Sequence, residues 1–247
     1  MKSNNQFYDA ISLFYDEMID FDKAVKKRMK LLEKIVSSEM VYAADIGCGT
    51  GIDSIALSIL GLEVTSFDPS EEMLKTSKEN SNRFNTNILF RNYSADKIPQ
   101  KYFGKFDLVV SLGNTFANIP RQKLFQSLLR CNKVLKKEGR FVFQILNYSK
   151  ILNEKKRIVK VSSDEENYFI RFYDFLNNKI QFNILSFSKK NPENLQLIST
   201  QIYPHTFKVI RDNLQKAGFK EVKMYEGLGG EIFSSKKSND LIIDCIC

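Results

Sequence analysis

The sequence predicts an α/β protein with a doubly wound, seven-stranded Rossmann-like sheet and an antiparallel β insert. Three observations predict this fold. Short apolar stretches alternate with helix-periodic stretches as far as residue 150, which is typical of a parallel sheet with helices on both faces. A glycine-rich turn follows the first apolar stretch, at residues 45–51. After residue 150, the pattern changes to consecutive strand-like runs.

The elements of the sheet follow one another at short intervals. Residues 5–36 carry apolar side chains every three or four positions, which predicts helix, and Asp20-Phe21-Asp22 is expected to divide that helix. The segment Lys137-Glu138-Gly139 is the expected stop of a later helix. We expect strands at 41–46, 63–67, 87–91, 106–111 and 140–146, with helices at 52–60, 70–80 and 120–135.

The second half of the chain predicts an antiparallel meander and the completion of the sheet. Strand-like runs at 168–176 and 179–188 are joined by Asn177-Asn178, which tolerates the positive φ of a tight hairpin. We expect a third strand at 195–203, a helix at 205–217, and strands at 219–225 and 240–247. The expected organisation is a helical cap (1–40), a core (41–150 and 204–247), and an insert (151–203) that covers the strand ends as a substrate lid.

The turn Asp45-Ile46-Gly47-Cys48-Gly49-Thr50-Gly51 has the composition of a ligand-binding turn between a strand and a helix. Glycine has no Cβ and adopts positive φ without strain, so a ligand can lie against the main chain. The following helix offers free N–H groups and the positive end of its dipole. The spacing is G-x-G-x-G, unlike the G-x-G-x-x-G of dinucleotide sites, and an acid precedes the first glycine. A cationic ligand is therefore favoured over a pyrophosphate, and an NAD enzyme is the least favoured interpretation.

Asp68 closes the second predicted strand, 21 residues after Gly47. That interval is close to the one expected for a carboxylate that accepts hydrogen bonds from ribose hydroxyls. Ser70 is the better N-cap for the helix that begins after Pro69, which leaves Asp68 for a ligand. The turn and this acid together predict a nucleoside-binding βαβ unit.

Composition narrows the class of protein. The chain has 247 residues, 43% hydrophobic and 27% charged, as in ordinary soluble domains. No apolar run reaches the roughly 18 residues that cross a bilayer, no signal-peptide pattern is visible, and four cysteines show no metal or disulfide spacing. These features predict a cytoplasmic protein without a membrane or metal partner. Net charge is +8, but the lysines form separate small clusters without interleaved aromatics, so nucleic acid is not an expected partner.

The glycine turn resembles motif I of the class I S-adenosylmethionine (SAM) methyltransferases. Other segments resemble their glycine N-methyltransferase and glycine/sarcosine N-methyltransferase branch, and together they cover most of the chain. These segments are Asp16-Glu17-Met18-Ile19-Asp20-Phe21, Gly49-Thr50-Gly51-Ile52-Asp53-Ser54-Ile55, Ser111-Leu112-Gly113-Asn114-Thr115-Phe116-Ala117-Asn118-Ile119-Pro120, Asn147-Tyr148-Ser149-Lys150-Ile151-Leu152 and Tyr203-Pro204-His205. The resemblance implies methyl transfer from SAM to a small-molecule amine, with S-adenosylhomocysteine as product and no metal. It also suggests a homo-oligomer.

Three departures from the family pattern lie where an amino-acid substrate would bind. Leu146 stands where an arginine is expected, Ser149 where an aspartate is expected, and Asn118 where a histidine is expected. The resemblance therefore implies a small amine as the methyl acceptor, without singling out glycine.

The resemblance also implies which residues hold the cofactor. Main chain at three glycines would cradle the methionyl part, and acids at the ends of the first two strands would bind the ammonium and the ribose. An amide and an aromatic after the third strand would bind adenine, and a helical lysine would pair with the cofactor carboxylate. Gly47, Gly49 and Gly51 are the three glycines, Asp45 would bind the ammonium, and Asp68 would bind the ribose. Asn92 and Tyr93 would bind adenine, with Met73 packed against it, and Lys26 is the lysine that would pair with the carboxylate. Leu112 and Gly113 would lie beside the sulfonium.

The candidate substrate-binding residues come from five segments distant in sequence. Asn114, Tyr203 and His205 are the catalytic candidates, and His205 would act as a general base if the acceptor were a hydroxyl. Arg171, or Lys179, would supply a cation to a carboxylate-bearing substrate. The remaining candidate substrate-binding residues are Tyr15, Asn147 and Tyr148.

The chemistry requires little from side chains. A neutral amine attacks a methyl carbon that the sulfonium already activates, so the protein mainly aligns donor and acceptor and excludes water. Two alternatives stay open. One keeps the cofactor but uses a hydroxyl or RNA as the acceptor, and the other is a SAM-binding module without catalysis.

Overall fold

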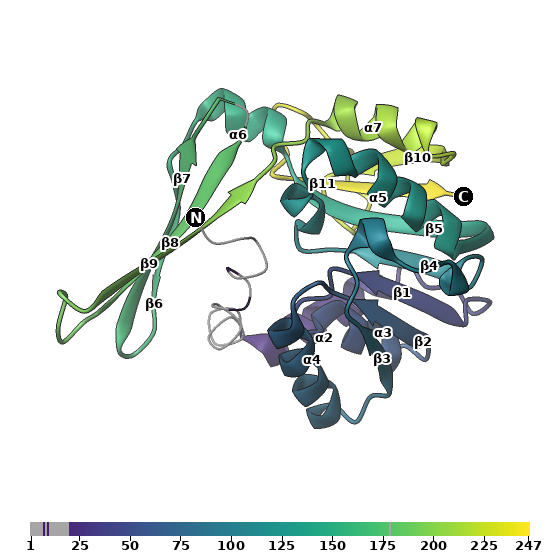
Figure 1. Ribbon diagram of the computed structural model, residues 1–247, viewed down its shortest axis with the longest axis horizontal. Helices are drawn as coiled ribbons and strands as arrows, with labels where there is room; N and C mark the ends of the chain where they lie inside the picture. Colours follow the sequence, from purple (N-terminus) through teal and green to yellow (C-terminus); the bar gives the residue numbers. More distant parts are fainter. Residues whose placement is uncertain (1–6, 8, 10–19, 178) are drawn as a thin grey trace.

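The computed structural model describes residues 7, 9, 20–177 and 179–247, and Tyr15 lies outside this range. A seven-stranded sheet forms the centre, in the order β10-β11-β5-β4-β1-β2-β3 (Figure 1). Its strands are β1 (Tyr42–Ile46), β2 (Glu63–Phe67), β3 (Ile88–Arg91), β4 (Phe106–Ser111), β5 (Leu135–Leu146), β10 (Lys220–Tyr225) and β11 (Asp240–Ile246). The predicted fold class is confirmed, and the predicted strands match closely except at the start of β5.

The sheet is mixed: the strands of the βα part are parallel, as predicted, and the last two strands, for which no direction was predicted, are antiparallel. Strands β1 to β5 pair in parallel, whereas β11 runs antiparallel to both of its neighbours, β5 and β10. The central strands are buried on both faces, and Leu108, Val109 and Val110 of β4 have no exposed surface. Such continuous apolar runs are typical of strands that helices cover on both sides.

Helices cover both faces of this sheet. Helices α2 (Phe21–Leu32) and α3 (Ile52–Ile59) pack into one buried cluster, while α5 (Arg121–Val134) and α7 (Phe207–Lys216) pack into the other. Helix α4 (Glu71–Arg83) follows β2 and lies next to β3. The two-sided cover is what the alternation of strands and helices predicts.

The segment predicted to end the fifth helix lies inside a strand instead. Helix α5 ends at Val134, and β5 begins at Leu135. Glu138 has φ of 62°, and a Cβ on Gly139 would lie 2.8 Å from the Lys136 carbonyl oxygen. The register between β4 and β5 shifts at this point. Gly139 therefore belongs to an irregularity in strand β5 and does not end a helix.

A second, antiparallel sheet has four strands, one more than the sequence predicts. Its order is β6-β7-β8-β9, with β6 (Ile158–Ser163), β7 (Asn167–Phe175), β8 (Ile180–Ser188) and β9 (Leu195–Ile202). The sequence analysis missed β6 and the short helix α6 (Tyr148–Glu154) before it. Strand β6 lies at the edge and is exposed along most of its length, so it lacks the apolar and polar alternation that identifies a strand.

The second sheet stands beside the carboxyl ends of the parallel strands (Figure 1). Its base joins the main core, because Tyr173, Ile180 and Ile202 pack in the cluster of α5, β5 and α7. Further out, Ile184 and Ile198 pack with Phe7 and with Met73 of α4. The insert therefore faces the edge of the core sheet at which the glycine-rich turn lies.

Candidate functional site

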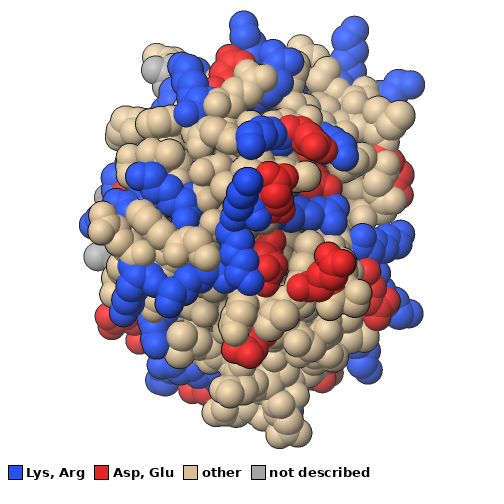
Figure 2. Space-filling model, turned by 90° about the vertical axis from the view of Figure 1, so that its right-hand side faces the viewer, with Lys and Arg blue, Asp and Glu red and all other residues tan. Residues whose placement is uncertain are grey.

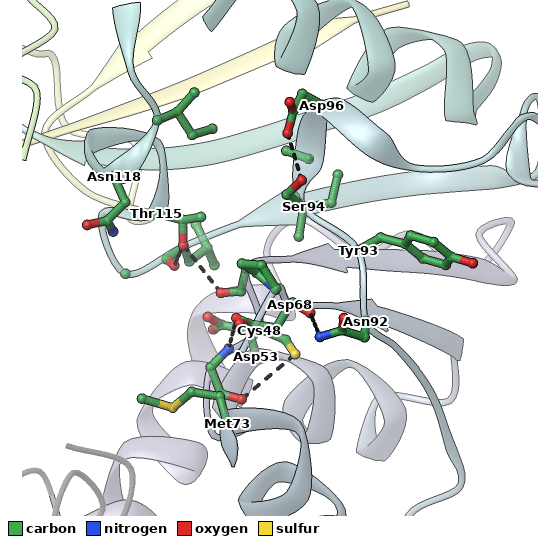
Figure 3. A pocket seen from close by; sticks show the side chains of 18 of the residues that line it. Cys48, Asp53, Asp68, Met73, Asn92, Tyr93, Ser94, Asp96, Thr115 and Asn118 are labelled. Atoms are coloured by element: carbon green, nitrogen blue, oxygen red, sulfur yellow. Dashed lines mark hydrogen bonds between the residues drawn. The ribbon is translucent and has the colours of Figure 1, made fainter. Parts of the chain in front are cut away.

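A cavity of about 670 Å³ lies at the carboxyl ends of the parallel strands, within the size range of ligand pockets (Figure 3). It is lined by the turn after β1, the ends of β2 and β3, and the segment after β4. Helix α2 adds one side chain from the N-terminal part of the chain. The lining residues discussed below include Arg28, Gly47, Gly49, Asp53, Asp68, Met73, Asn92, Tyr93, Leu112, Gly113, Thr115 and Asn118.

The glycine turn is fixed to the sheet and open to the cavity. The N–H groups of Gly47 and Cys48 donate to the carbonyl of Phe67, at 2.7 and 3.2 Å. Gly47 and Gly49 have positive φ, of 72° and 54°. A Cβ on Gly47 would collide with Thr115, whereas a Cβ on Gly49 would meet no atom within 4 Å. Gly49 lines the cavity, so this position leaves open main chain where a ligand can lie.

Asp68 holds the turn from the end of β2. Its carboxylate oxygens accept from the Gly49 N–H at 3.0 Å and from the Ser70 N–H at 2.9 Å. Burial raises its pKa to about 6, against the lowering effect of these two bonds. A carboxylate has about four acceptor sites, so two remain for hydroxyl donors in the cavity. Ser70 caps α4 by accepting from the Met73 N–H at 3.1 Å, as predicted from sequence.

Asp45 lies beneath the turn, 1% exposed. One carboxylate oxygen accepts from the Ser54 hydroxyl at 2.6 Å, and the other, Oδ1, has no hydrogen-bond partner. Burial raises the pKa of Asp45 well above its ordinary value, and the neighbouring Asp53 adds to this. Asp45 itself lies outside the cavity lining, as does Gly51 of the turn, so neither of these two predicted residues meets the cavity directly.

Three cations line the cavity: Arg28 of α2, Lys97 and Lys123, and Arg28 lies beside the turn after β1. Its Nε lies 2.9 Å from Oδ1 of Asp53, which is itself buried and has a raised pKa because of burial. Lys26 is exposed and lies outside the cavity lining, so it does not occupy the place that the sequence analysis gave it. Helical periodicity was the missed signal: Phe21, Val25 and Leu32 are buried, and Arg28 shares their face whereas Lys26 does not.

Met73, Asn92 and Tyr93, the residues that the resemblance assigns to adenine, all line the cavity. Met73 is buried, with Phe7 and Ile184 packed around it. The Asn92 side chain donates to the main-chain oxygen of Asp68 at 3.2 Å, which connects the ends of β2 and β3. Figure 3 shows the Tyr93 ring directed away from Asp68 and Met73.

The segment after β4 forms the opposite wall. Leu112 and Gly113 line the cavity, and Gly113 has φ of 81°. The Thr115 hydroxyl is shared between the carbonyls of Gly47 and Leu112, both at 3.3 Å. The Ser111 hydroxyl donates to the Ile46 carbonyl at 2.6 Å. These bonds join the ends of β1 and β4 into one rigid edge.

Asn114, which lies between Gly113 and Thr115 in the sequence, forms hydrogen bonds with strand β5 and the segment that follows it. Its N–H donates to Gln144, its Oδ1 accepts from the Leu146 N–H at 3.0 Å, and its Nδ2 donates to the Tyr148 hydroxyl at 2.8 Å. Neither Asn114 nor Tyr148 lines the cavity, and Tyr148 is 1% exposed. Both residues connect β4 with the end of β5.

Asn147 likewise has structural partners. Its Nδ2 donates to the carbonyls of Ser235 and Ser238, both at 2.9 Å, and its Oδ1 accepts from the Lys150 N–H at 3.3 Å as the N-cap of α6. It is 2% exposed and lies outside the cavity lining. The amide therefore holds the loop before β11 rather than facing the cavity.

Tyr203 and His205 connect the insert to the segment after β4. The Tyr203 N–H donates to Ala117 at 2.7 Å, and Nε2 of His205 lies 2.9 Å from the Ile119 carbonyl oxygen. Burial lowers the pKa of His205, and Arg121 acts in the same direction. His205 is buried and outside the cavity lining. Arg171 lies in β7 and pairs in register with Ile184, on the face turned to the core.

Charge is mixed over the surface that faces away from the insert. Figure 2 shows Lys and Arg side chains interspersed with Asp and Glu on that face. Within the described ranges, no group of three or more His, Cys, Asp or Glu side chains could hold a metal ion. No helix in the same ranges is both long and apolar enough to cross a membrane.

Comparison with known proteins places these features in a family. A methyltransferase-domain model matches residues 43–139, which include the glycine turn, Asp68 and the segment after β4. Human glycine N-methyltransferase is 39% identical over 123 residues, covering 44% of this chain. The glycine/sarcosine N-methyltransferase of Aphanothece halophytica is 27% identical over 154 residues, covering 61% of this chain. The matches span 42% and 57% of those relatives, less than two thirds of either.

A solved structure extends the similarity to the whole fold. The S-adenosylmethionine-dependent methyltransferase from Clostridium acetobutylicum superposes with a TM-score of 0.77 at 17% identity. The superposition covers 97% of this chain and 98% of that one. At this identity the likeness concerns the fold, and it includes the insert as well as the core.

Proposed function

Because the chain belongs to the SAM-dependent methyltransferases, we propose that it transfers a methyl group from SAM to a small-molecule amine. The observation that carries the proposal is the open main chain at Gly49, held by Asp68 at the edge of a cavity of about 670 Å³. The N-methyltransferase relatives support an amine as the acceptor.

The residues present fit the chemical groups of SAM. The carboxylate of Asp53 lines the cavity and suits the ammonium, while Asp45, beneath the turn and outside the lining, would act on the ammonium only through water. Arg28 would bind the cofactor carboxylate, in place of Lys26. The remaining acceptor sites of Asp68 suit ribose hydroxyls, and Asn92 and Met73 lie where adenine would bind.

When bound, the sulfonium supplies an activated methyl group, so the chain has to position an acceptor in line with it and exclude water. Gly113 and Leu112 would bring main chain beside the transferred group. The bonds from Thr115 and Ser111 keep that wall fixed relative to the turn. A neutral amine attacks without help from a side-chain base, so a site without a lining histidine is compatible with N-methylation.

The acceptor would enter between the cavity and the inner face of the insert, which acts as a lid. Asn118, which lines the cavity, and Tyr203 and Arg171 from the insert are the proposed contacts of the acceptor. Arg171 would bind a carboxylate if the acceptor carries one. Asn114, Asn147 and Tyr148 are proposed to support this region through the hydrogen bonds described above rather than to touch the acceptor.

Paired aspartate variants test the cofactor site. Asp68→Asn removes a charged acceptor from the cavity and should weaken SAM binding by about 1–3 kcal/mol, measured by calorimetry. Asp107→Asn is the matched control, because Asp107 also accepts from backbone N–H groups, those of Val41 and Tyr42, but at the opposite end of the sheet. Equal affinities for both variants and the unmodified protein would remove Asp68 from the site.

The acceptor is found by incubating the protein with methyl-labelled SAM and separate pools of amines, hydroxylated metabolites and RNA. Label in the amine pool supports the proposal. Label in the hydroxylated pool, together with a steep loss of turnover in His205→Gln, supports O-methylation instead. Label in RNA with strongly salt-dependent binding would indicate a nucleic-acid substrate. SAM binding without label in any pool would indicate a non-catalytic module.

A further inference from the structure

The cavity extends beyond the residues that fit the cofactor. Its lining continues along the short 3₁₀ helix Ala95–Lys97 that follows β3, and along the start of α5, which packs against that helix. Figure 3 shows Asp96 and Asn118 at the end of the cavity opposite Met73. We call this end the second lobe and define it by five lining residues, Ser94, Asp96, Lys97, Asn118 and Lys123.

The two ends of the cavity differ in charge. At the glycine turn, the carboxylates of Asp53 and Asp68 accompany the guanidinium of Arg28. In the second lobe, two lysines accompany one carboxylate. Two acids against one base give the first end a formal charge of −1, and two bases against one acid give the second lobe +1. The first end therefore suits a cationic ligand, whereas the second lobe suits an anionic group.

The carboxylate of the second lobe has partners of its own. One oxygen of Asp96 accepts from the Ser94 hydroxyl at 2.7 Å, and the other lies 3.2 Å from the Lys123 ammonium. An ammonium has three donors, and the Lys123 side chain is 50% exposed, so donors remain for a ligand. Within the described ranges, Lys97 takes part in no ion pair. The second lobe therefore offers cationic donors to a ligand.

A short helix separates the second lobe from the place of methyl transfer. Gly113 would lie beside the transferred group, and the 3₁₀ helix Thr115–Asn118 leads from there to the second lobe. At about 2 Å per residue, this path places Asn118 on the order of 8 Å from Gly113. In glycine, the amine and the carboxylate share one carbon atom, so glycine is too short to reach both places.

We propose that the second lobe binds an anionic group, a carboxylate or a phosphate, at the end of the methyl acceptor that is remote from its amine. This inference rests on the proposed function and names the class of acceptor for the same site. Lys97 and Lys123 determine specificity by donating charge-assisted hydrogen bonds to the anionic group. The favoured acceptor is an elongated ω-amino acid or ω-amino phosphate, and Arg171, which lies outside the cavity lining, is not its anion partner.

The first test measures binding rather than turnover, by calorimetry on the protein saturated with S-adenosylhomocysteine. The anionic probes are ω-aminohexanoate and ω-aminobutyl phosphate, ω-aminohexanamide is the neutral counterpart, and glycine is the short one. Both anionic probes should bind at least about fivefold more tightly than the amide and glycine. Their affinity should fall as salt is added, because the lysines are exposed. The anionic probe that binds more tightly identifies the group as carboxylate or phosphate.

Substitutions test the two lysines individually. Lys97→Met and Lys123→Met should each weaken binding of the anionic probes about three- to fivefold and leave binding of the amide unchanged. Lys123→Arg keeps the charge and should retain the affinity. Lys101→Met is the matched control, because Lys101 is exposed and close in sequence but does not line the cavity. Affinity for S-adenosylhomocysteine should change less than about twofold in all four variants.

An effect of opposite sign is expected at Asp96. Asp96→Asn removes the carboxylate of the second lobe and releases the Lys123 ammonium, so the anionic probes should bind about threefold more tightly. If the ion pair served only to hold the lobe together, the same substitution would weaken binding instead. Circular dichroism verifies that each variant is folded, and Lys97→Met does not disturb the ion pair at all.

Turnover with labelled SAM connects the second lobe to the reaction. The KM of the anionic probes should follow their affinities across the variants, while kcat changes little. Equal affinity for the charged and neutral probes would overturn the inference. A loss confined to Arg171→Met would place the anionic group at the insert, and a loss of S-adenosylhomocysteine affinity in Lys97→Met would assign that lysine to the cofactor. If no amine is methylated, the proposed function fails, whereas the binding measurements still decide whether the second lobe holds an anion.

Discussion

The cavity at the core sheet and the insert beside it are built by different means. At the cavity, the main chain of one turn and hydrogen bonds between adjacent strand ends fix the geometry: Gly47, Gly49 and Asp68 lie within one turn and one strand end, and Ser111 and Thr115 join the end of β4 to them. In the insert and the segments that face it, the relevant side chains come from positions as far apart as Asn114, Arg171 and His205. The cavity therefore depends on a few adjacent strand ends, whereas the candidate acceptor-binding residues depend on packing between distant segments.

The largest expected effect is a difference in stability between substitutions at two glycines of the same turn. Gly47→Ala forces a Cβ onto Thr115 at positive φ and should lower the free energy of unfolding by about 2–4 kcal/mol, measured by urea denaturation. Gly49→Ala meets no neighbour and should cost about 1–2 kcal/mol from backbone strain alone, while its methyl group enters the cavity and weakens SAM binding.

Thr115→Ala in the Gly47→Ala background provides the control, because it removes Cγ2 and Oγ1, the two atoms nearest to the new Cβ. It should recover part of the lost stability. Equal destabilisation by the two single substitutions would contradict the local description of the turn.

The next effect tests whether Asn147 belongs to the fold or to the acceptor site. Asn147→Ala leaves buried carbonyls without their donor and removes the N-cap of α6, so unfolding should require about 2–3 kcal/mol less. SAM affinity should change less than about twofold. Asn191→Ala, in an exposed turn, serves as the control and should be nearly neutral. If Asn147→Ala is stable but binds the acceptor poorly, Asn147 belongs to the substrate wall and not to the fold.

A smaller effect distinguishes two basic residues on one helix. Arg28→Ala removes the lining cation that lies beside Asp53 and should weaken SAM binding about tenfold, or about 1.4 kcal/mol. Lys26→Ala, two residues earlier on the exposed face, should leave the affinity unchanged. Calorimetry on both variants decides between them, and the reverse order would restore the assignment made from sequence.

The smallest effect is a dependence on pH. Burial raises the pKa of Asp68 from 3.8 to about 6, so the folded protein holds this proton more tightly than the unfolded chain. As the pH rises from 3.8 to about 6, the free energy of unfolding without ligand should therefore fall. SAM affinity should rise, because the ribose hydroxyls need the charged acceptor, by about tenfold between pH 5 and 7. Titration calorimetry and urea denaturation, each measured over this range, should give these opposite trends. Trends of the same sign would show that another group controls binding.

The sequence predicted most of the fold because its signals were local. Strand β2 and strand β4 were predicted at their observed bounds from short apolar runs, and Asp68 from its interval after Gly47. Strand β6 could not be found, since an exposed edge strand shows no alternation. The antiparallel direction of β11 depends on tertiary pairing that the residues of the strand alone do not specify.

The candidate site shows the same difference between features with a local sequence signal and features that depend on distant partners. Of the residues that the glycine pattern and the resemblance assigned to the cofactor, Gly47, Gly49, Asp68, Met73, Asn92, Tyr93, Leu112 and Gly113 line the cavity, whereas Asp45, Gly51 and Lys26 do not. Asn114, Asn147 and Tyr148 were assigned to the substrate wall by resemblance, but their polar groups bond within the fold. Partners such as Ser235, far along the chain, cannot be read from the residues themselves. Arg28 was missed although the buried face of its helix could have identified it.

The junction at Tyr203 and His205 has a consequence for how this chain could acquire a new acceptor. Both residues bond to main-chain carbonyls, those of Ala117 and Ile119, which any side chains at those positions would also present. A β6–β9 segment taken from another protein could thus attach through the same two hydrogen bonds, with no change to the residues that line the cavity. Chimeras joined just before Tyr203 should retain their affinity for SAM while taking on the acceptor range of the donor sheet.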